Sequence, residues 1–169
     1  MTLLTTNRLQ LRNLRKTDAA EIFSYRNCDT CARYQRWDDT SLAAIEQMIE
    51  DHKNDSFPAL KPEQRFAISL SETYFIGELA VFFSVNDRCF TIGITICPQA
   101  QRQGFATEIL SEVTRQLRNH FPAADIVALI DPENTASIRL FEKLGFIQEC
   151  YAESIHSYVY TILGAVASN

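Results

Sequence analysis

The sequence predicts a mixed α/β fold in which one sheet carries helices on both faces. Three observations lead to this class: short runs of strand character, longer segments with apolar residues at helical spacing, and the order in which the two alternate. The expected succession is β-α-α-β-β-β-α-β-α-β-β. With 169 residues, 46% of them hydrophobic, the chain can bury a substantial core, and its length suits a single domain over residues 1–169 better than two.

The first third of the chain is expected to hold one strand and two helices. Arg8 to Leu14 alternates polar and apolar residues, which predicts a half-buried strand with Leu9 and Leu11 on one face. Asp18 is expected to cap the first helix while Glu21 reaches back to it. The stripe of that helix is Ala19, Ile22, Phe23 and Arg26, and the stripe of a second helix, beginning near Thr40 or Ser41, is Leu42, Ile45, Met48 and Ile49.

The rest of the chain is expected to form a three-stranded meander and then to alternate helices with strands. The expected strands are Arg65 to Leu70, Tyr74 to Phe83, Cys89 to Cys97, Asp125 to Ile130, Phe146 to Ala152 and His156 to Leu163. The expected helices are Gly104 to about Phe121, with the stripe Phe105, Ile109, Leu110, Val113, Leu117 and Phe121, and Asn134 to Leu144. Gly145 stands where a glycine commonly ends a helix.

The segment QRQGFATE, Gln101 to Glu108, places Gly104 in the first turn of the longest helix. Glycine costs about 0.5–1 kcal/mol in a helix relative to alanine, so the position needs a compensating reason. A tight turn into the helix is one such reason. A bound anion is the other, because the first N–H groups of a helix point outward and a residue without a side chain lets a diphosphate approach them. Gln101, Arg102 and Gln103 would then supply side-chain donors around the anion.

Composition excludes several function classes. The net charge of −5 argues against a nucleic-acid partner, and no segment approaches the length needed to cross a bilayer. The first residues lack the pattern of a signal peptide, so we expect a cytoplasmic protein, either a monomer or a homodimer. Cys28 and Cys31 form a C-x-x-C pair without a second pair or nearby histidines. We therefore expect no metal, and thiols packed as small apolar residues.

Two sequence blocks carry a family resemblance. The usual nucleotide cradles, G-x-G-x-x-G and G-x-x-x-x-G-K-S/T, are absent. The order strand, QRQGFA, helix, followed about thirty residues later by DPENTASIRLFEKLGF, resembles the GNAT superfamily of acyl-CoA-dependent N-acyltransferases. In that family the pattern R/Q-x-x-G-x-G/A binds the coenzyme A pyrophosphate, and Gln101, Gly104 and Ala106 match its three defined positions. The second block resembles the branch that includes ribosomal-protein N-terminal acetyltransferases, and the resemblance extends from Thr6 to about Leu163.

The resemblance implies a mixed, mostly antiparallel sheet of about seven strands and acetyl-CoA as co-substrate. It implies that N–H groups from Arg102 to Thr107 hold the pyrophosphate and that the strand around Ile94 to Cys97 pairs with the pantetheine arm. Asn134 would hydrogen-bond that arm or fix the adjacent backbone. The cofactor-binding residues implied in this way are Ile94, Thr95, Ile96, Gln101, Arg102, Gln103, Gly104, Phe105, Ala106, Thr107, Asn134 and Phe141.

Direct transfer to an amine requires a neutral amine, a donor to the oxyanion and a proton for the departing thiolate. Many relatives carry a tyrosine acid seven residues after the asparagine, where this chain has Phe141. Ser137 is the nearest hydroxyl and the expected acid, with a plain helix-surface serine as the alternative. Relatives often carry a glutamate base where this chain has Thr91. Glu78 is the expected base here, with a solvated strand carboxylate as the competing interpretation.

The acceptor pocket is expected between the two N-terminal helices and the final strands. Tyr34, Trp37 and Tyr158 are the expected substrate-binding residues, because aromatic faces beside carboxylates such as Asp38 suit an ammonium group. The same aromatics could instead be core residues, and His156 is a further ionisable candidate. The expected reaction is acetyl transfer to a primary amine on a protein N-terminus, possibly ribosomal, or on a small molecule. The substitutions at the acid and base positions leave a non-catalytic acyl-CoA-binding regulator open as the alternative.

Overall fold

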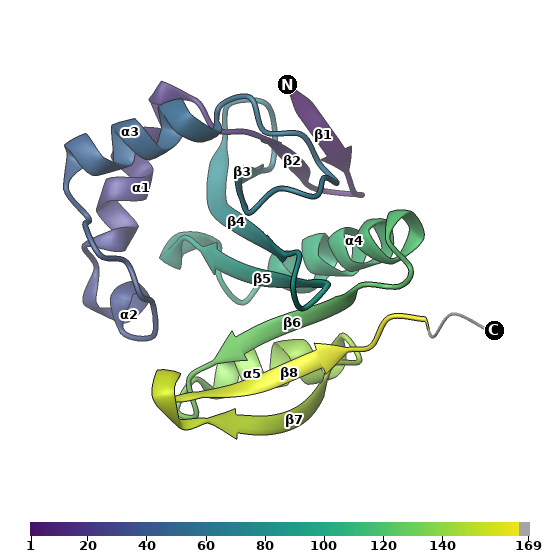
Figure 1. The fold of residues 1–169 in the computed structure, drawn as a ribbon. Helices are drawn as coiled ribbons and strands as arrows, with labels where there is room; N and C mark the ends of the chain where they lie inside the picture. Colours follow the sequence, from purple (N-terminus) through teal and green to yellow (C-terminus); the bar gives the residue numbers. More distant parts are fainter. Residues whose placement is uncertain (166–169) are drawn as a thin grey trace. The chain divides into compact units, whose positions relative to one another are not determined.

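The computed structural model describes residues 1–165, and its eight strands form one sheet in the order β1-β2-β3-β4-β5-β6-β8-β7 (Figure 1). By its internal contacts the chain divides into two compact units. The first unit comprises Met1–Phe57, Gln64–Ala80 and Ile94–Phe105, and the second comprises Pro58–Glu63, Val81–Gly93 and the chain from Ala106 onward. The expected α/β class with a mixed sheet is confirmed, with one strand more than the resemblance implied.

The elements follow the sequence expectations closely. The strands are β1 (Thr2–Thr5), β2 (Gln10–Asn13), β3 (Glu63–Ser69), β4 (Phe75–Ser84), β5 (Cys89–Ile96), β6 (Asp125–Ile130), β7 (Ile147–Ala152) and β8 (Ser157–Ile162). The helices are α1 (Ala19–Arg26), α2 (Asp29–Ala32), α3 (Leu42–His52), α4 (Phe105–His120) and α5 (Thr135–Lys143). Of these strands and α-helices, the sequence did not predict β1 and α2, which have four residues each and are too short to show a hydrophobic period.

The first unit is built on an antiparallel ladder. Leu11 of β2 pairs with Leu4 of β1 on one side and with Ile68 of β3 on the other. Helices α1 and α3 contact one another beside these strands (Figure 1). Their apolar faces form one core with the strands, whose buried members are Leu14, Ala19, Ile22, Tyr25, Cys31, Ile45, Ile49, Ala67, Phe75 and Cys97.

The start of α1 corrects one prediction. Asp18 precedes the helix as expected, but its carboxylate caps no helical N–H group. Both carboxylate oxygens instead accept from the buried Arg12 guanidinium at 2.8 Å, and Oδ2 also accepts from the backbone N–H of Arg15. A bidentate pair with a buried guanidinium is stronger than a cap, because it is charge-assisted twice and leaves no buried charge alone. The predicted capping box with Glu21 is therefore wrong.

The two N-terminal helices bury narrower stripes than expected. Ser41 caps α3 as predicted by accepting from the Ala44 N–H at 3.3 Å, and Ile45 and Ile49 are fully buried. Leu42 is 46% exposed and Phe23 of α1 is 42% exposed, so both were wrongly placed in the core. Leu42 is the first residue of its helix, and Phe23 lies about 100° around α1 from the buried Ile22.

The second unit holds β6, β7, β8 and α5 together with all of α4 after its first residue (Figure 1). Strand β6 runs parallel to β5, with Phe90 opposite Ile126, and antiparallel to β8, with Ala128 opposite Tyr160. Helix α4 buries Phe105, Ile109, Leu110, Val113 and Leu117 as predicted, whereas Phe121, the last residue of the predicted stripe, follows the end of the helix and is half-buried. Gly145 follows α5 at φ +86°, which confirms its predicted place at the helix end.

Candidate functional site

The loop that joins β5 to α4 has the backbone of an anion-binding turn. Strand β5 passes through a 3₁₀ turn at Pro98–Ala100 into Gln101–Gly104, which we call the β5–α4 loop. Two of its four residues have left-handed backbones, Arg102 at φ +61° and Gly104 at φ +80°. Within residues 1–165 the N–H groups of Arg102, Gln103 and Gly104 have no recorded acceptor. Successive exposed N–H groups of this kind form a concave surface that suits an anion.

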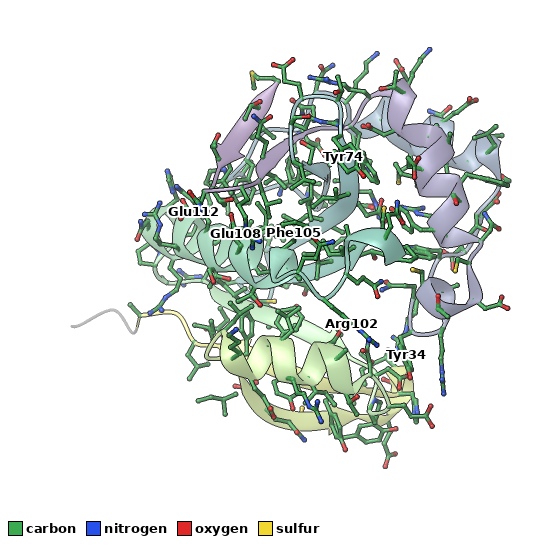
Figure 2. The ribbon with its side chains drawn as sticks, turned by 180° about the vertical axis from the view of Figure 1, so that it is seen from behind. Tyr34, Tyr74, Arg102, Phe105, Glu108 and Glu112 are labelled. Carbon is green, nitrogen blue, oxygen red and sulfur yellow. The ribbon has the colours of Figure 1, made fainter. Side chains whose placement is uncertain are left out.

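Side chains hold this loop in place. The Gln101 amide donates from Nε2 to the Ile96 carbonyl at 2.9 Å and lies 3.9 Å from Cys31 Sγ. The Gln103 amide donates to the Gln99 carbonyl at 3.2 Å. Both glutamines were expected to surround the anion with donors, but here their amides bond to the protein. In the described part of the chain, the Arg102 side chain has no recorded partner and extends from the loop (Figure 2).

The strand before the loop is fixed by a close approach of two backbones. Thr95 and Ile96 are buried and Ile94 is half-buried. A Cβ atom added to Gly77 of β4 would lie 2.2 Å from the Thr95 carbonyl oxygen, and the Cys97 N–H donates to the Ile76 carbonyl at 2.8 Å. Only glycine permits this contact, so the expected pantetheine-binding segment has a well-defined position within the first unit.

A buried ion pair lies between α1 and β4 in the first unit. Arg26 Nη2 bonds to both carboxylate oxygens of Glu78, at 2.8 and 2.9 Å, and the two residues are 6% and 4% exposed. Burial disfavours the charge of Arg26, yet the neighbouring Glu78 carboxylate raises its pKa overall. Burial and then the Glu78 charge raise the pKa of Tyr25 well above its usual value. The interpretation of Glu78 as a solvated strand carboxylate is therefore wrong.

The predicted acceptor residue Trp37 packs against this ion pair. Its ring centre lies 5.1 Å from the Arg26 guanidinium carbon and 5.9 Å from the Tyr25 ring, and the side chain is half-buried. Tyr34 is also half-buried, with the Arg33 guanidinium 5.1 Å from its ring centre. The exposed Asp39 accepts from the Ser41 N–H, which lowers the pKa of its carboxyl. This segment thus combines an aromatic face with exposed carboxylates.

In the second unit, Asn134 and Ser137 meet at the start of α5. Asn134 is the N-cap, and its Oδ1 accepts from the Ser137 N–H at 3.2 Å. Ser137 is half-buried, and across residues 1–165 its hydroxyl has no recorded hydrogen-bond partner. Phe141, one of the implied cofactor residues, is 4% exposed and meets Phe146 edge-on at 5.0 Å between ring centres. Its position is that of a core residue within the second unit.

The tyrosines of the last strands occupy different environments. Tyr158 of β8 lies opposite Tyr151 of β7, with ring centres 5.7 Å apart, and is half-buried. The Tyr151 hydroxyl bonds to Nδ1 of the exposed His156 at 2.5 Å. Tyr160 is 1% exposed, and its hydroxyl shares one donor hydrogen between Glu142 Oε1 and Gln148 Oε1, each at 3.2 Å. Tyr160 is thus a core residue, whereas Tyr158 remains accessible.

The sequence did not predict the partnership of Arg26 with Glu78, nor any role for Arg8. The available signal was Arg26 itself, a charge on the apolar stripe of α1, matched by Glu78 inside the apolar strand FIGELAVFFS. Two charges of opposite sign on buried faces generally pair.

A metal site and a membrane span would each need a recognisable group of residues. Within residues 1–165 no cluster of three or more His, Cys, Asp or Glu side chains could hold a metal ion, and none of the helices has the length and hydropathy of a membrane span.

Comparisons with known proteins agree on one family. The family model for the acetyltransferase (GNAT) domain matches residues 8–147. YoaA of Bacillus subtilis strain 168, an uncharacterized N-acetyltransferase, is 32% identical over 152 residues, which cover 87% of this chain and 84% of that protein.

Solved structures show the same fold. A GNAT-family acetyltransferase from Bacillus anthracis superposes with a TM-score of 0.79 at 20% identity, covering 96% of this chain and 98% of that one. A proposed ribosomal-protein-serine acetyltransferase from Vibrio cholerae gives 0.77 at 21% identity, covering 96% and 97%. Spermidine N-acetyltransferase from Vibrio cholerae, in complex with CoA and spermine, gives 0.73 at 21%, covering 91% and 93%. The chain therefore belongs to the GNAT acetyltransferase family and is an N-acetyltransferase.

Proposed function

We propose that this chain transfers the acetyl group of acetyl-CoA directly to a primary amine of a small polyamine or of a protein N-terminus. The observation that carries the proposal is the β5–α4 loop, whose left-handed Arg102 and Gly104 leave three consecutive N–H groups without a recorded acceptor inside the described residues. The match of Gln101, Gly104 and Ala106 to the family's pyrophosphate pattern supports the same assignment.

The residues of this loop fit a diphosphate. A Cβ atom added to Gly104 would meet only Arg8 Nη2, at 3.5 Å, so the space beside this residue is open. We assign the pyrophosphate to the N–H groups of Arg102 to Thr107 and the pantetheine arm to the backbone of Ile94 to Ile96. Asn134 is assigned to the same arm. When bound, acetyl-CoA supplies an activated acyl group with a thiolate as leaving group.

The protein then needs to manage two protons. The amine has to lose one before its nitrogen can attack, and the thiolate has to gain one as the carbon–sulfur bond breaks. We assign protonation of the thiolate to the Ser137 hydroxyl, which has no recorded competing partner across residues 1–165. We assign removal of the amine proton to Glu78. The Glu78 carboxylate is held in place by the Arg26 guanidinium, which bonds to both of its oxygens.

The acceptor class follows from the segment around Trp37. Its aromatic ring already faces a cation, Arg26, and the neighbouring exposed Asp39 is held as a carboxylate. An ammonium group, whether on a polyamine or at a protein N-terminus, is attracted by the exposed carboxylate of Asp39. The related spermidine N-acetyltransferase and the proposed ribosomal-protein-serine acetyltransferase act, by their names, on acceptors of these two kinds.

The test is an acceptor screen. The purified protein is incubated with acetyl-CoA and, separately, with spermidine, spermine and a panel of unblocked peptides, while free thiol is monitored. Release of thiol that depends on the acceptor, with an acetylated product of the matching mass, supports the proposal. Binding of coenzyme A without acceptor-dependent release from any amine would overturn it in favour of a regulator.

A further inference from the structure

Arg8 makes three separate approaches to the β5–α4 loop and the helix that follows it. Its Nη1 donates to the Gln103 carbonyl at 3.1 Å. Its guanidinium carbon lies 4.6 Å from the centre of the Phe105 ring, in cation–π contact. Its Nη2 is the nearest atom to the position that a Cβ on Gly104 would take, at 3.5 Å. All of these residues belong to the first unit.

The bond to the Gln103 carbonyl fixes the direction of one particular N–H group. The carbonyl of Gln103 and the N–H of Gly104 belong to the same planar peptide, and in a trans peptide they point in opposite directions. Arg8 draws the carbonyl to its own side, so the Gly104 N–H faces the other side. Within residues 1–165 that N–H group has no recorded acceptor.

We propose that Arg8 is a positioning residue for coenzyme A: it orients the Gln103–Gly104 peptide so that the Gly104 N–H points at the diphosphate. The inference rests on the proposed function of the loop. Arginine suits this role because its planar guanidinium can donate to a carbonyl and stack on an aromatic ring at the same time, which an ammonium group does less well. The stacking on Phe105 also ties the orientation of the peptide to the first residue of α4.

Two substitutions and two acyl donors test this role. Arg8→Ala should weaken coenzyme A binding, measured by calorimetry, about tenfold, the loss expected for one charge-assisted hydrogen bond and the orientation that it maintains. Arg8→Lys should recover part of that loss. With acetyl-CoA, KM should rise while kcat changes little. With acetyl-pantetheine, which has no diphosphate, kcat/KM should stay within about twofold of the unmodified protein.

Arg15 provides a matched control, because its Nη1 also donates to a distant backbone carbonyl, that of Glu72 at 2.7 Å, in the same unit. Arg15→Ala should leave coenzyme A affinity unchanged. Equal affinity of Arg8→Ala and the unmodified protein would overturn the role of Arg8, as would an equal loss with both acyl donors, which would mark a general structural effect. An unmodified protein that bound no coenzyme A would overturn the proposed function and this inference together.

Discussion

The β5–α4 loop and the buried Arg26–Glu78 pair lie in the same unit and are built in opposite ways. The loop exposes all four of its residues and presents backbone N–H groups, which any sequence of suitable conformation possesses. The ion pair consists of two side chains more than fifty positions apart in the sequence, both almost completely buried. Recognition by backbone needs one short segment of chain, whereas recognition by side chains needs the fold to bring distant residues together.

The largest effect is expected from breaking the buried pair. Glu78→Gln leaves the Arg26 charge buried without its carboxylate, so the free energy of unfolding should fall by about 3–5 kcal/mol. Urea denaturation measures this. Glu112→Gln is the matched control, because its pair with Arg115 lies at the surface and should contribute at most about 1 kcal/mol. Equal losses in the two variants would mean that the burial of Arg26 and Glu78 has no energetic consequence.

A substitution in the β5–α4 loop should reduce coenzyme A affinity more than it reduces stability. Gly104→Val places a side chain at φ +80°, which costs about 1–2 kcal/mol of strain, and fills the space assigned to the diphosphate. Coenzyme A affinity should fall about a hundredfold or more, an affinity difference of about 2.7 kcal/mol. Gly145→Val meets the same strain at φ +86° with no atom nearby. It should lose similar stability and keep its affinity, and a similar loss of affinity would contradict the assignment.

A third experiment separates the acid from the coenzyme site. Ser137→Ala should lower kcat about a hundredfold, a typical contribution of general acid catalysis, without changing coenzyme A affinity or stability. The reason is that across residues 1–165 the Ser137 hydroxyl has no recorded bond that the folded protein would lose. Ser111→Ala, which removes a hydroxyl bonded to the Thr107 carbonyl on α4, serves as control. Unchanged turnover of Ser137→Ala would exclude Ser137 as the acid.

The smallest expected effect is a difference in the rate at which two thiols are alkylated. Cys97 precedes the β5–α4 loop, and Cys28 follows α1, the helix that carries Arg26. Burial raises the pKa of Cys97 to about 12. Hydrogen bonding from Thr30 lowers the pKa of Cys28, which packs beside the core of α1 and α3. As pH rises, the Cys28 thiolate forms first, so iodoacetamide at about pH 8 should label Cys28 and leave Cys97 unmodified. Peptide mass spectrometry checks this, and early labelling of Cys97 would show that the strand end opens readily.

The sequence predicted the loop far better than the ion pair, for a physical reason. The segment QRQGFATE marked the junction of a strand and a helix within eight residues, but it predicted Gly104 in the first helical turn, whereas α4 begins at Phe105 and Gly104 precedes it at φ +80°. The partnership of Arg26 with Glu78, and of Arg8 with Gln103, depends on which strand lies beside which helix. Asp18 illustrates the same limit. Its local sequence pattern predicted a helix cap, but in the folded chain both of its carboxylate oxygens accept hydrogen bonds from the guanidinium of Arg12 on β2. The single-domain organisation stays a prediction.

The Gln101 side chain donates a hydrogen bond to the Ile96 carbonyl. This bond suggests why the first position of the family pattern can be either arginine or glutamine. Arginine and glutamine share little in charge or shape, but both are long side chains that end in N–H donors. If that position serves to hydrogen-bond the loop to the strand before it, arginine and glutamine are interchangeable there, because the strand carbonyl requires only an N–H donor. Glutamate, equal in length to glutamine and lacking any donor when ionised, should then be rejected.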